Sequence, residues 1–266
     1  MGKVISVVNQ KGGVGKTTTA INLSACLAMA EKKVLLIDFD PQGNTSSGIG
    51  IDRKEIGVSI YNILIGETDI KNAVYKTEME YLCVIPATMD LIGAEIELVG
   101  MEKRETRLKI ALEQIRDEYK FIIIDTPPSL GLLTINSLTA ADSVLIPLQC
   151  EYYALEGLSH LLRTIKLVKS SLNPCLTTEG ILLTMHDGRT LISNQIFEEV
   201  KRYFSNYLFK TIIPRNVRLS EAPGYGKPIV FYDIKSKGAD AYLELAREVI
   251  ANAEKGPGSR VGSTYS

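Results

Sequence analysis

The residue types best suited to chemistry stand together at residues 9–18, which run Asn-Gln-Lys-Gly-Gly-Val-Gly-Lys-Thr-Thr. An apolar run at residues 4–8 precedes them, and a stretch with helical periodicity follows them at once. Glycines let the backbone curl so that successive N–H groups converge on phosphate oxygens, and the following helix adds the positive end of its dipole. The order of strand, glycine loop and helix therefore predicts a P-loop.

Two side chains of this loop have distinct expected tasks. Lys16 is placed to reach the β- and γ-phosphates of a nucleotide, and the Thr17 hydroxyl is placed to ligate Mg²⁺. The residues expected to surround the phosphates are Lys11, Gly12, Gly13, Val14, Gly15, Lys16, Thr17 and Thr18.

Carboxylates end two further apolar runs. A P-loop needs a carboxylate at the end of a neighbouring strand to hold the Mg²⁺ water shell, and Asp125 ends the run at residues 121–124. Asp38 and Asp40 end another run, and alternate residues of an extended segment share one side. We therefore expect both of these carboxylates to face one site.

Apolar runs of strand length recur along the chain and must position these residues. They lie at residues 4–8, 34–37, 82–85, 121–124, 144–146 and 181–183. Continuous apolar strands that alternate with helices indicate a mostly parallel sheet with helices on both faces and right-handed crossovers. Helices are expected at residues 17–30, 103–118, 155–171, 192–204 and 239–253.

The fold class that follows is α/β, a single-domain P-loop NTPase over residues 1–254. Residues 255–266 are small, polar and without periodicity, so we expect a disordered tail or a remnant that is not native. No apolar run approaches the roughly 20 residues needed to span a bilayer, and no cleavable signal pattern is present, so a cytoplasmic protein is expected.

The four cysteines are far apart in the sequence and form no Cys/His cluster. This spacing predicts neither a disulfide framework nor a zinc site, and we expect buried structural thiols.

Charge is distributed unevenly although the formal net charge is −1. Residues 1–159 carry 15 basic and 21 acidic side chains, whereas residues 160–250 carry 13 basic and 9 acidic ones. A near-neutral protein can bind a polyanion through a local patch, and the second half is where such a patch would lie. An ordinary solvated surface explains these counts equally well.

The P-loop departs from the usual pattern, because Gln10 stands where the first glycine belongs and an extra lysine, Lys11, follows it. This segment resembles the deviant Walker A motif, KGGxxK[ST], of the ParA/MinD family of ATPases. In that family the extra lysine reaches across a dimer interface to the partner's phosphates. The resemblance implies that ATP with Mg²⁺ joins two chains, and that Lys11 and Lys16 stabilise charge as water attacks the γ-phosphate.

The same resemblance implies further site residues. The DxDPQGN stretch at residues 38–44 is similar to the family's switch I, with Asp38 near the metal shell and Asp40 orienting the attacking water. Residues 213–228 resemble the segment that contacts adenine, which implies base contacts from Pro214 and Asn216. These two residue types suit a turn equally well. The implied metal ligands or shell residues are Thr17, Asp38 and Asp125.

Within the family the likeness is greatest to small chromosomal ParA proteins, also called Soj, and it covers residues 1–250, including the stretch at 150–158. It implies chromosome or plasmid partitioning with a ParB partner, and ATP-bound homodimers that bind double-stranded DNA without sequence preference on the nucleoid. Arg189 and Arg218 match the family's DNA-binding arginines. Weaker candidates, for which a solvated surface charge is the simpler explanation, are Lys201, Arg202 and Lys210.

Three other functions share the P-loop. A MinD-like membrane regulator uses a C-terminal amphipathic helix as a lipid anchor, but the sequence after Lys255 has no apolar face. An electron-transfer ATPase like the nitrogenase iron protein needs two cysteines per chain, but no cysteine follows Asp125 closely. A metabolic ligase stays open because fold does not fix function, although the partition-type segments argue against it.

Overall fold

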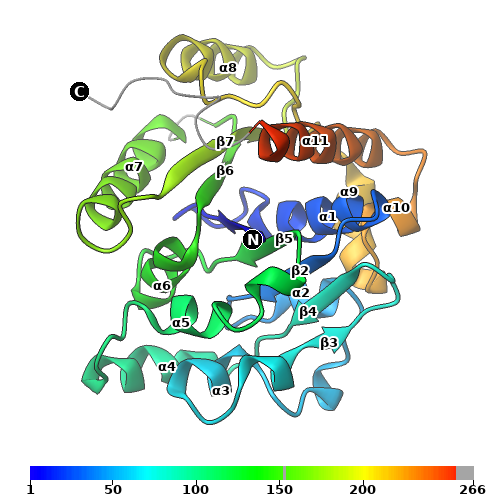
Figure 1. The fold of residues 1–266 in the computed structure, drawn as a ribbon. Coiled ribbons are helices and arrows are strands. Elements are labelled where there is room, and N and C mark those ends of the chain that lie inside the picture. The colour runs from blue at the N-terminus through cyan, green and yellow to red at the C-terminus, as the bar shows by residue number, and fades with distance from the viewer. Residues whose placement is uncertain (152–153, 256–266) are drawn as a thin grey trace.

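The six apolar runs all form strands of one sheet in the computed structural model, which describes residues 1–151 and 154–255 (Figure 1). The strands are β1 (Lys3–Val7), β2 (Val34–Asp38), β3 (Tyr75–Lys76), β4 (Leu82–Ile85), β5 (Phe121–Asp125), β6 (Ser143–Gln149) and β7 (Thr177–Thr184). Their order is β3-β4-β2-β5-β1-β6-β7. Only the edge pair β3–β4 is antiparallel among these strands, so the predicted mostly parallel sheet is confirmed.

The described residues also form eleven α-helices and five short 3₁₀ helices, of which α8 to α11 and η5 follow the last strand. The α-helices are α1 (Lys16–Met29), α2 (Asn44–Gly48), α3 (Ile60–Ile65), α4 (Leu91–Glu97), α5 (Arg107–Leu112), α6 (Leu132–Ala140), α7 (Ala154–Ser171), α8 (Leu191–Phe204), α9 (Val217–Glu221), α10 (Ile229–Tyr232) and α11 (Lys237–Glu254). The 3₁₀ helices are η1 (Arg53–Glu55), η2 (Ile70–Ala73), η3 (Leu98–Gly100), η4 (Arg116–Glu118) and η5 (Ala222–Tyr225).

Four of the five predicted helices form close to their expected bounds, as α1, α7, α8 and α11. The continuous helix predicted at residues 103–118 is wrong. Lys103 has a left-handed backbone with φ of 55°, and the chain becomes helical only after Thr106. The helix then stops at Leu112, and η4 follows it separately.

The strands send alternate side chains into two apolar cores, one on each face of the sheet. On β1, Val4 belongs to the first core, whereas Ile5 and Val7 belong to the second. The first core is closed by helices that include α6 and α7, and the second by α1 and α11. Figure 1 shows α11 beside α1 on one side of the sheet and α5 with α6 on the other. Burial on both faces explains why these strands are apolar throughout.

The arrangement of β1, β2 and β5 brings the predicted site residues together. β5 lies between β1 and β2, and the register pairs Asp125 with Val7 on one side and with Asp38 on the other. Since parallel strands end at the same edge, the P-loop after β1 and both carboxylates meet there.

The expectation of buried cysteines holds for two of the four residues. Cys26 and Cys150 are buried, but Cys83 is half-buried and Cys175 is exposed, between α7 and β7. Burial raises the pKa of Cys26 to about 12, so this thiol stays protonated and unreactive near neutral pH. All four are free thiols.

The predicted tail falls, apart from Lys255, outside the described residues. In the part of the chain that the structure describes, no helix combines the length and the apolar character required to cross a membrane.

Candidate nucleotide site

Hydrogen bonds to two strands fix the shape of the P-loop. The buried Asn9 donates from Nδ2 to the carbonyl of Pro147 on β6 at 2.7 Å, and its Oδ1 accepts the backbone N–H of Lys11 at 2.9 Å. On β7, the Thr184 hydroxyl donates to the carbonyl of Val14 at 2.8 Å. Strands β6 and β7 therefore hold the loop from outside the β1–α1 unit.

Left-handed glycines allow the loop to close tightly. Gly13 has φ of 76° and Gly15 has φ of 88°, a region that side chains with a Cβ atom rarely adopt. Gly15 is also the N-cap of α1 and has no side chain with which to cap the helix. The first-turn N–H groups of α1 are consequently available to an anion, as a phosphate cradle requires.

Lys16 is a buried ammonium group at the start of α1. Its side chain donates from Nζ to the carbonyl of Lys11 at 3.2 Å, and the residue is 6% exposed. Burial lowers the pKa of Lys16, while the nearby charges of Asp125 and Asp40 oppose that shift. A buried cation needs an anionic partner, and a triphosphate in the adjoining loop supplies one.

Asp125 is fully buried and has one carboxylate oxygen in use. Its Oδ2 accepts the hydroxyls of Thr17 at 2.8 Å and Thr45 at 2.6 Å. Its Oδ1 is buried without a hydrogen-bond partner among the described residues. Burial raises the pKa of Asp125 to about 6. An oxygen-rich pair of this kind, a carboxylate beside a threonine hydroxyl, suits Mg²⁺, so the residues present fit that ion.

Asp38 is the second buried carboxylate, next to Asp125 in the sheet register. Its Oδ2 accepts the backbone N–H of Ser46 at 2.8 Å and the Ser46 hydroxyl at 2.6 Å. Burial and the charge of Asp125 raise the pKa of Asp38 to about 7. Asp38 thus anchors α2 and adds negative charge beside Asp125.

Asp40 lies two residues further along the same segment and is 9% exposed. Its Oδ1 accepts the backbone N–H of Gln42 at 2.9 Å, and its own N–H donates to Asp38 at 3.3 Å. Its charge opposes the lowering of the Lys16 pKa. The structure therefore brings Lys16 and all three predicted carboxylates to one edge of the sheet.

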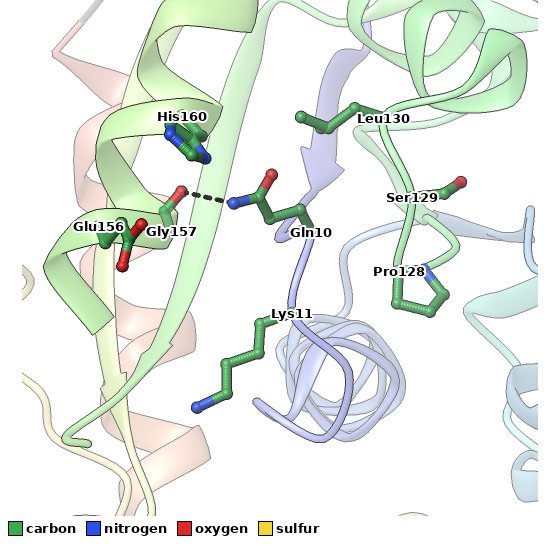
Figure 2. Close-up of a pocket in the computed structure, with 8 residues that line it drawn as sticks. All are labelled: Gln10, Lys11, Pro128, Ser129, Leu130, Glu156, Gly157 and His160. Carbon is green, nitrogen blue, oxygen red and sulfur yellow. Dashed lines mark hydrogen bonds between the residues drawn. The ribbon is translucent and has the colours of Figure 1, made fainter. Parts of the chain in front are cut away.

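Lys11 stands apart from this buried group. Its Nζ makes an ion pair with Glu151 Oε2 at 2.6 Å, and the two side chains are 40% and 47% exposed. Neighbouring Gln10 donates to the carbonyl of Gly157 on α7 at 3.3 Å (Figure 2). Lys11 is thus accessible from outside the chain, whereas Lys16 is not.

A cavity of about 530 Å³ adjoins Lys11 on the outer side of the P-loop. Figure 2 shows α7 on one side of it and the loop that follows Asp125 on the other. Its lining consists of Gln10, Lys11, Pro128, Ser129, Leu130, Glu156, Gly157 and His160. The glycines of the P-loop are not part of this lining, so the cavity lies beside the phosphate cradle and not within it.

The segments predicted to contact adenine and DNA lie side by side. His186 pairs with Pro214 in a parallel bridge, and the Arg215 N–H donates to the His186 carbonyl at 3.2 Å. Asn216 is the N-cap of α9, where its Oδ1 accepts the N–H of Arg218 at 2.9 Å. Asn216 thus has the local structural role that the sequence also allowed. The adenine contacts of Pro214 and Asn216 stay predictions.

The arginines predicted to bind DNA are both accessible. Arg189 follows β7 and its side chain is 88% exposed, while Arg218 lies on α9 and its side chain is 54% exposed. The weaker candidates Lys201, Arg202 and Lys210 are exposed as well. Exposure fits a DNA contact and a solvated charge equally.

Several residues of the site were not predicted from the sequence. Thr45 and Ser46 bind Asp125 and Asp38, respectively, and their signal is the polar helix start directly after the DxDPQGN stretch. Asn9 and Thr184 hold the P-loop, and Glu151 holds Lys11. No sequence signal identifies Glu151 or Thr184, because each reaches the loop only through the order of the strands.

Comparisons with known proteins give a consistent family. A family model described as an AAA domain matches residues 2–178. The sporulation initiation inhibitor protein Soj of Bacillus subtilis is 60% identical over 252 residues, which cover 95% of this chain and all of that protein. The chromosome partitioning protein ParA of Myxococcus xanthus is 59% identical, over 98% of this chain and 93% of that protein.

Among solved structures, one similar chain is the cobyrinic acid a,c-diamide synthase of Mycobacterium smegmatis with bound ADP and magnesium. It has a TM-score of 0.84 and 38% sequence identity, over 97% of each chain. The fold thus also occurs in a protein named for a synthase. The identity to partitioning proteins is much higher, which argues against the metabolic ligase.

Proposed function

Because the chain belongs to the ParA/Soj family of chromosome-partitioning ATPases, we propose that its ATPase cycle works as a dimerisation switch at the P-loop. ATP and Mg²⁺ bind between β1 and α1, and two ATP-bound chains form a homodimer. The dimer binds double-stranded DNA without sequence preference, and hydrolysis separates the chains. A ParB-like protein stimulates hydrolysis on the nucleoid in the cytoplasm, and residues 1–254 form the ATPase domain.

The observation that carries this proposal is the environment of Asp125. Its Oδ2 accepts the hydroxyls of Thr17 and Thr45, and its buried Oδ1 has no partner among the described residues. Thr17 and Asp125 would hold Mg²⁺, with Asp38 behind them. The ion would neutralise charge on the β- and γ-phosphate oxygens.

Hydrolysis requires stabilisation of negative charge and a positioned water. Buried Lys16 and the loop N–H groups face the phosphates, and electrostatic stabilisation of this kind is strongest where water is excluded. Asp40 lies close enough to interact with Lys16, which supports a role in orienting the water for in-line attack on the γ-phosphate.

Lys11 is suited to act on a second chain. Its ion pair with Glu151 is between two partly exposed side chains, and such surface pairs contribute little to stability. A triphosphate of a partner chain, with more charge than one carboxylate, can therefore displace Glu151. The cavity beside Lys11 supports this face as the dimer contact.

The nucleotide dependence of DNA binding tests the switch. Wild type and Asp40→Ala are compared on a random-sequence duplex with ATP, with ADP and without nucleotide. We expect both proteins to bind with ATP, Asp40→Ala for longer because it hydrolyses slowly, and neither to bind tightly with ADP. Equal DNA affinity with ATP, with ADP and without nucleotide would contradict the proposed switch.

A further inference from the structure

Arg189 is held by a carboxylate of its own loop. Its guanidinium donates from Nε to Asp187 Oδ1 at 2.8 Å and from Nη2 to Asp187 Oδ2 at 2.7 Å. The Arg189 backbone N–H also donates to Oδ1 at 3.1 Å. This fork of two parallel hydrogen bonds holds the pKa of Asp187 well below its usual range. The carboxylate is thus ionised wherever the protein functions.

Arg218 is held in a similar way by acids of the neighbouring elements. Its Nη1 donates to Glu221 Oε2 at 2.9 Å, one turn further along the chain, and its Nε lies 3.5 Å from Asp233 Oδ2. The hydroxyl of Tyr232 donates to the same Glu221 oxygen at 3.0 Å, which fixes the carboxylate beside the arginine.

The two paired arginines belong to adjoining segments. The bridge between His186 and Pro214 joins the start of the Arg189 loop to the segment that leads into α9. Asp187 thus directly follows one end of this bridge, and Arg218 lies four residues beyond the other end. Because each acid contacts its arginine directly, a phosphate that approaches either guanidinium also approaches the acid. Each acid repels that phosphate and also occupies the donors that would bind it.

A guanidinium binds carboxylate and phosphate through the same planar fork of N–H groups. DNA must therefore displace the carboxylate before it gains the arginine. We propose that Asp187 and Glu221 are built-in competitors of DNA phosphate, which keep a single chain off DNA and leave binding to the dimer. This inference rests on the proposed DNA binding and adds its regulation.

The expected size follows from exposed ion pairs. Releasing one such pair is expected to raise affinity about 1.4- to fivefold. A single chain that loses both acids should gain about two- to 25-fold, because the two effects multiply. A dimer carries each acid twice, so the pairs weaken wild-type dimers too, but the doubled set of arginines outweighs that loss.

The test measures DNA binding of the full chain by fluorescence anisotropy with ADP and with ATP. The variants are Asp187→Asn, Glu221→Gln and both together; each keeps an acceptor oxygen for the local hydrogen bonds. The control is Glu105→Gln, which removes a carboxylate bound to Arg104 beside α5, on the side of the sheet away from α11. We expect the double variant with ADP to bind more tightly than wild type by the factor above, and the control to match wild type.

A second arm separates competition from simple charge. In an Arg189→Ala background, Asp187→Asn should lose most of its gain, because no guanidinium is left to release. If the double variant matches Glu105→Gln while wild type with ATP still binds DNA, the inference is overturned and the proposed function stands. If wild type with ATP does not bind DNA, the proposed function fails first.

Discussion

The nucleotide site and the arginine surface satisfy their charges in opposite ways. At the nucleotide site Lys16 is buried at the start of α1, and Asp38 and Asp125 are buried at the ends of β2 and β5; each is oriented by a hydrogen bond. On the arginine surface Arg189 and Arg218 are exposed and paired with nearby acids. Buried charges are costly without a ligand, whereas exposed pairs exchange partners readily. The first region is therefore built to hold a ligand tightly, and the second to bind and release.

The largest expected effect comes from a substitution in the buried nucleotide site. Lys16→Ala removes the ammonium that faces the phosphates, and we expect the rate of ATP hydrolysis to fall by about 10²- to 10³-fold. A malachite-green phosphate assay measures it, with Lys33→Ala, an exposed lysine between α1 and β2, as the control. A Lys16→Ala protein that keeps a tenth of the wild-type rate would show that the buried cation is not central.

The next largest effect is on the free energy of unfolding, which the buried carboxylates lower when Mg²⁺ and nucleotide are absent. The pKa of Asp38 is raised to about 7, above its unfolded value of about 3.9, so protons favour the folded chain. This stabilisation is complete below pH 4 and is lost as pH rises through 7. Asp38→Asn should therefore raise the free energy of unfolding by roughly 2–4 kcal/mol at pH 8, and by less at pH 5.

Urea unfolding in EDTA at pH 5 to 8 measures this difference. Asparagine keeps an oxygen to accept both Ser46 hydrogen bonds and loses only the longer 3.3 Å bond from the Asp40 N–H, so the local structure should persist. An Asp38→Asn protein less stable than wild type at pH 8 would mean that hydrogen bonding to the carboxylate outweighs its desolvation.

The exposed region should respond more weakly. Arg189→Glu replaces a contact with a repulsion in both chains of a dimer, and we expect DNA affinity with ATP to fall about 10- to 100-fold at low salt. The slope of log affinity against log salt should become less steep by about two, one for each lost phosphate contact. Titrations between 50 and 200 mM salt decide this, and an unchanged slope would place Arg189 outside the interface.

The smallest expected effect tests the support of the P-loop. Thr184→Val keeps the side-chain shape but removes the hydroxyl that donates to the Val14 carbonyl. Since one buried hydrogen bond contributes about 1 kcal/mol, the free energy of unfolding should fall by about that amount. Thr178→Val, at a half-buried position earlier on β7, is the matched control, and equal losses for the two variants would contradict the assigned role.

The sequence predicted the sheet well because strands such as β5, buried on both faces, are apolar along their whole length. It failed at residues 103–118, where a polar stretch had helical composition but Lys103 turns left-handed. The short helices α2, α9 and α10 were not predicted, since four or five residues carry no periodicity. Tertiary contacts rather than local preference determine such elements.

The site was predictable where its residues are contiguous, as in the P-loop, or where a strand end fixes a carboxylate, as at Asp125. It was not predictable where the strand order brings distant residues together, as for Thr184 and Glu151. The partners of Arg189 and Arg218 stand only two and three residues away, yet spacing alone does not decide whether a guanidinium turns toward a neighbour or toward solvent.

The most direct test of the switch is the mass of the particle formed with Mg²⁺ and a slowly hydrolysed ATP analogue, measured by light scattering. The variants are wild type, Lys11→Ala and Lys71→Ala, the last a surface lysine paired with Glu118 at 3.0 Å. If Lys11 reaches the partner's triphosphate, wild type and Lys71→Ala have the mass of two chains and Lys11→Ala that of one. Dimers of Lys11→Ala with wild-type affinity, or single chains of wild type, would contradict the composite site.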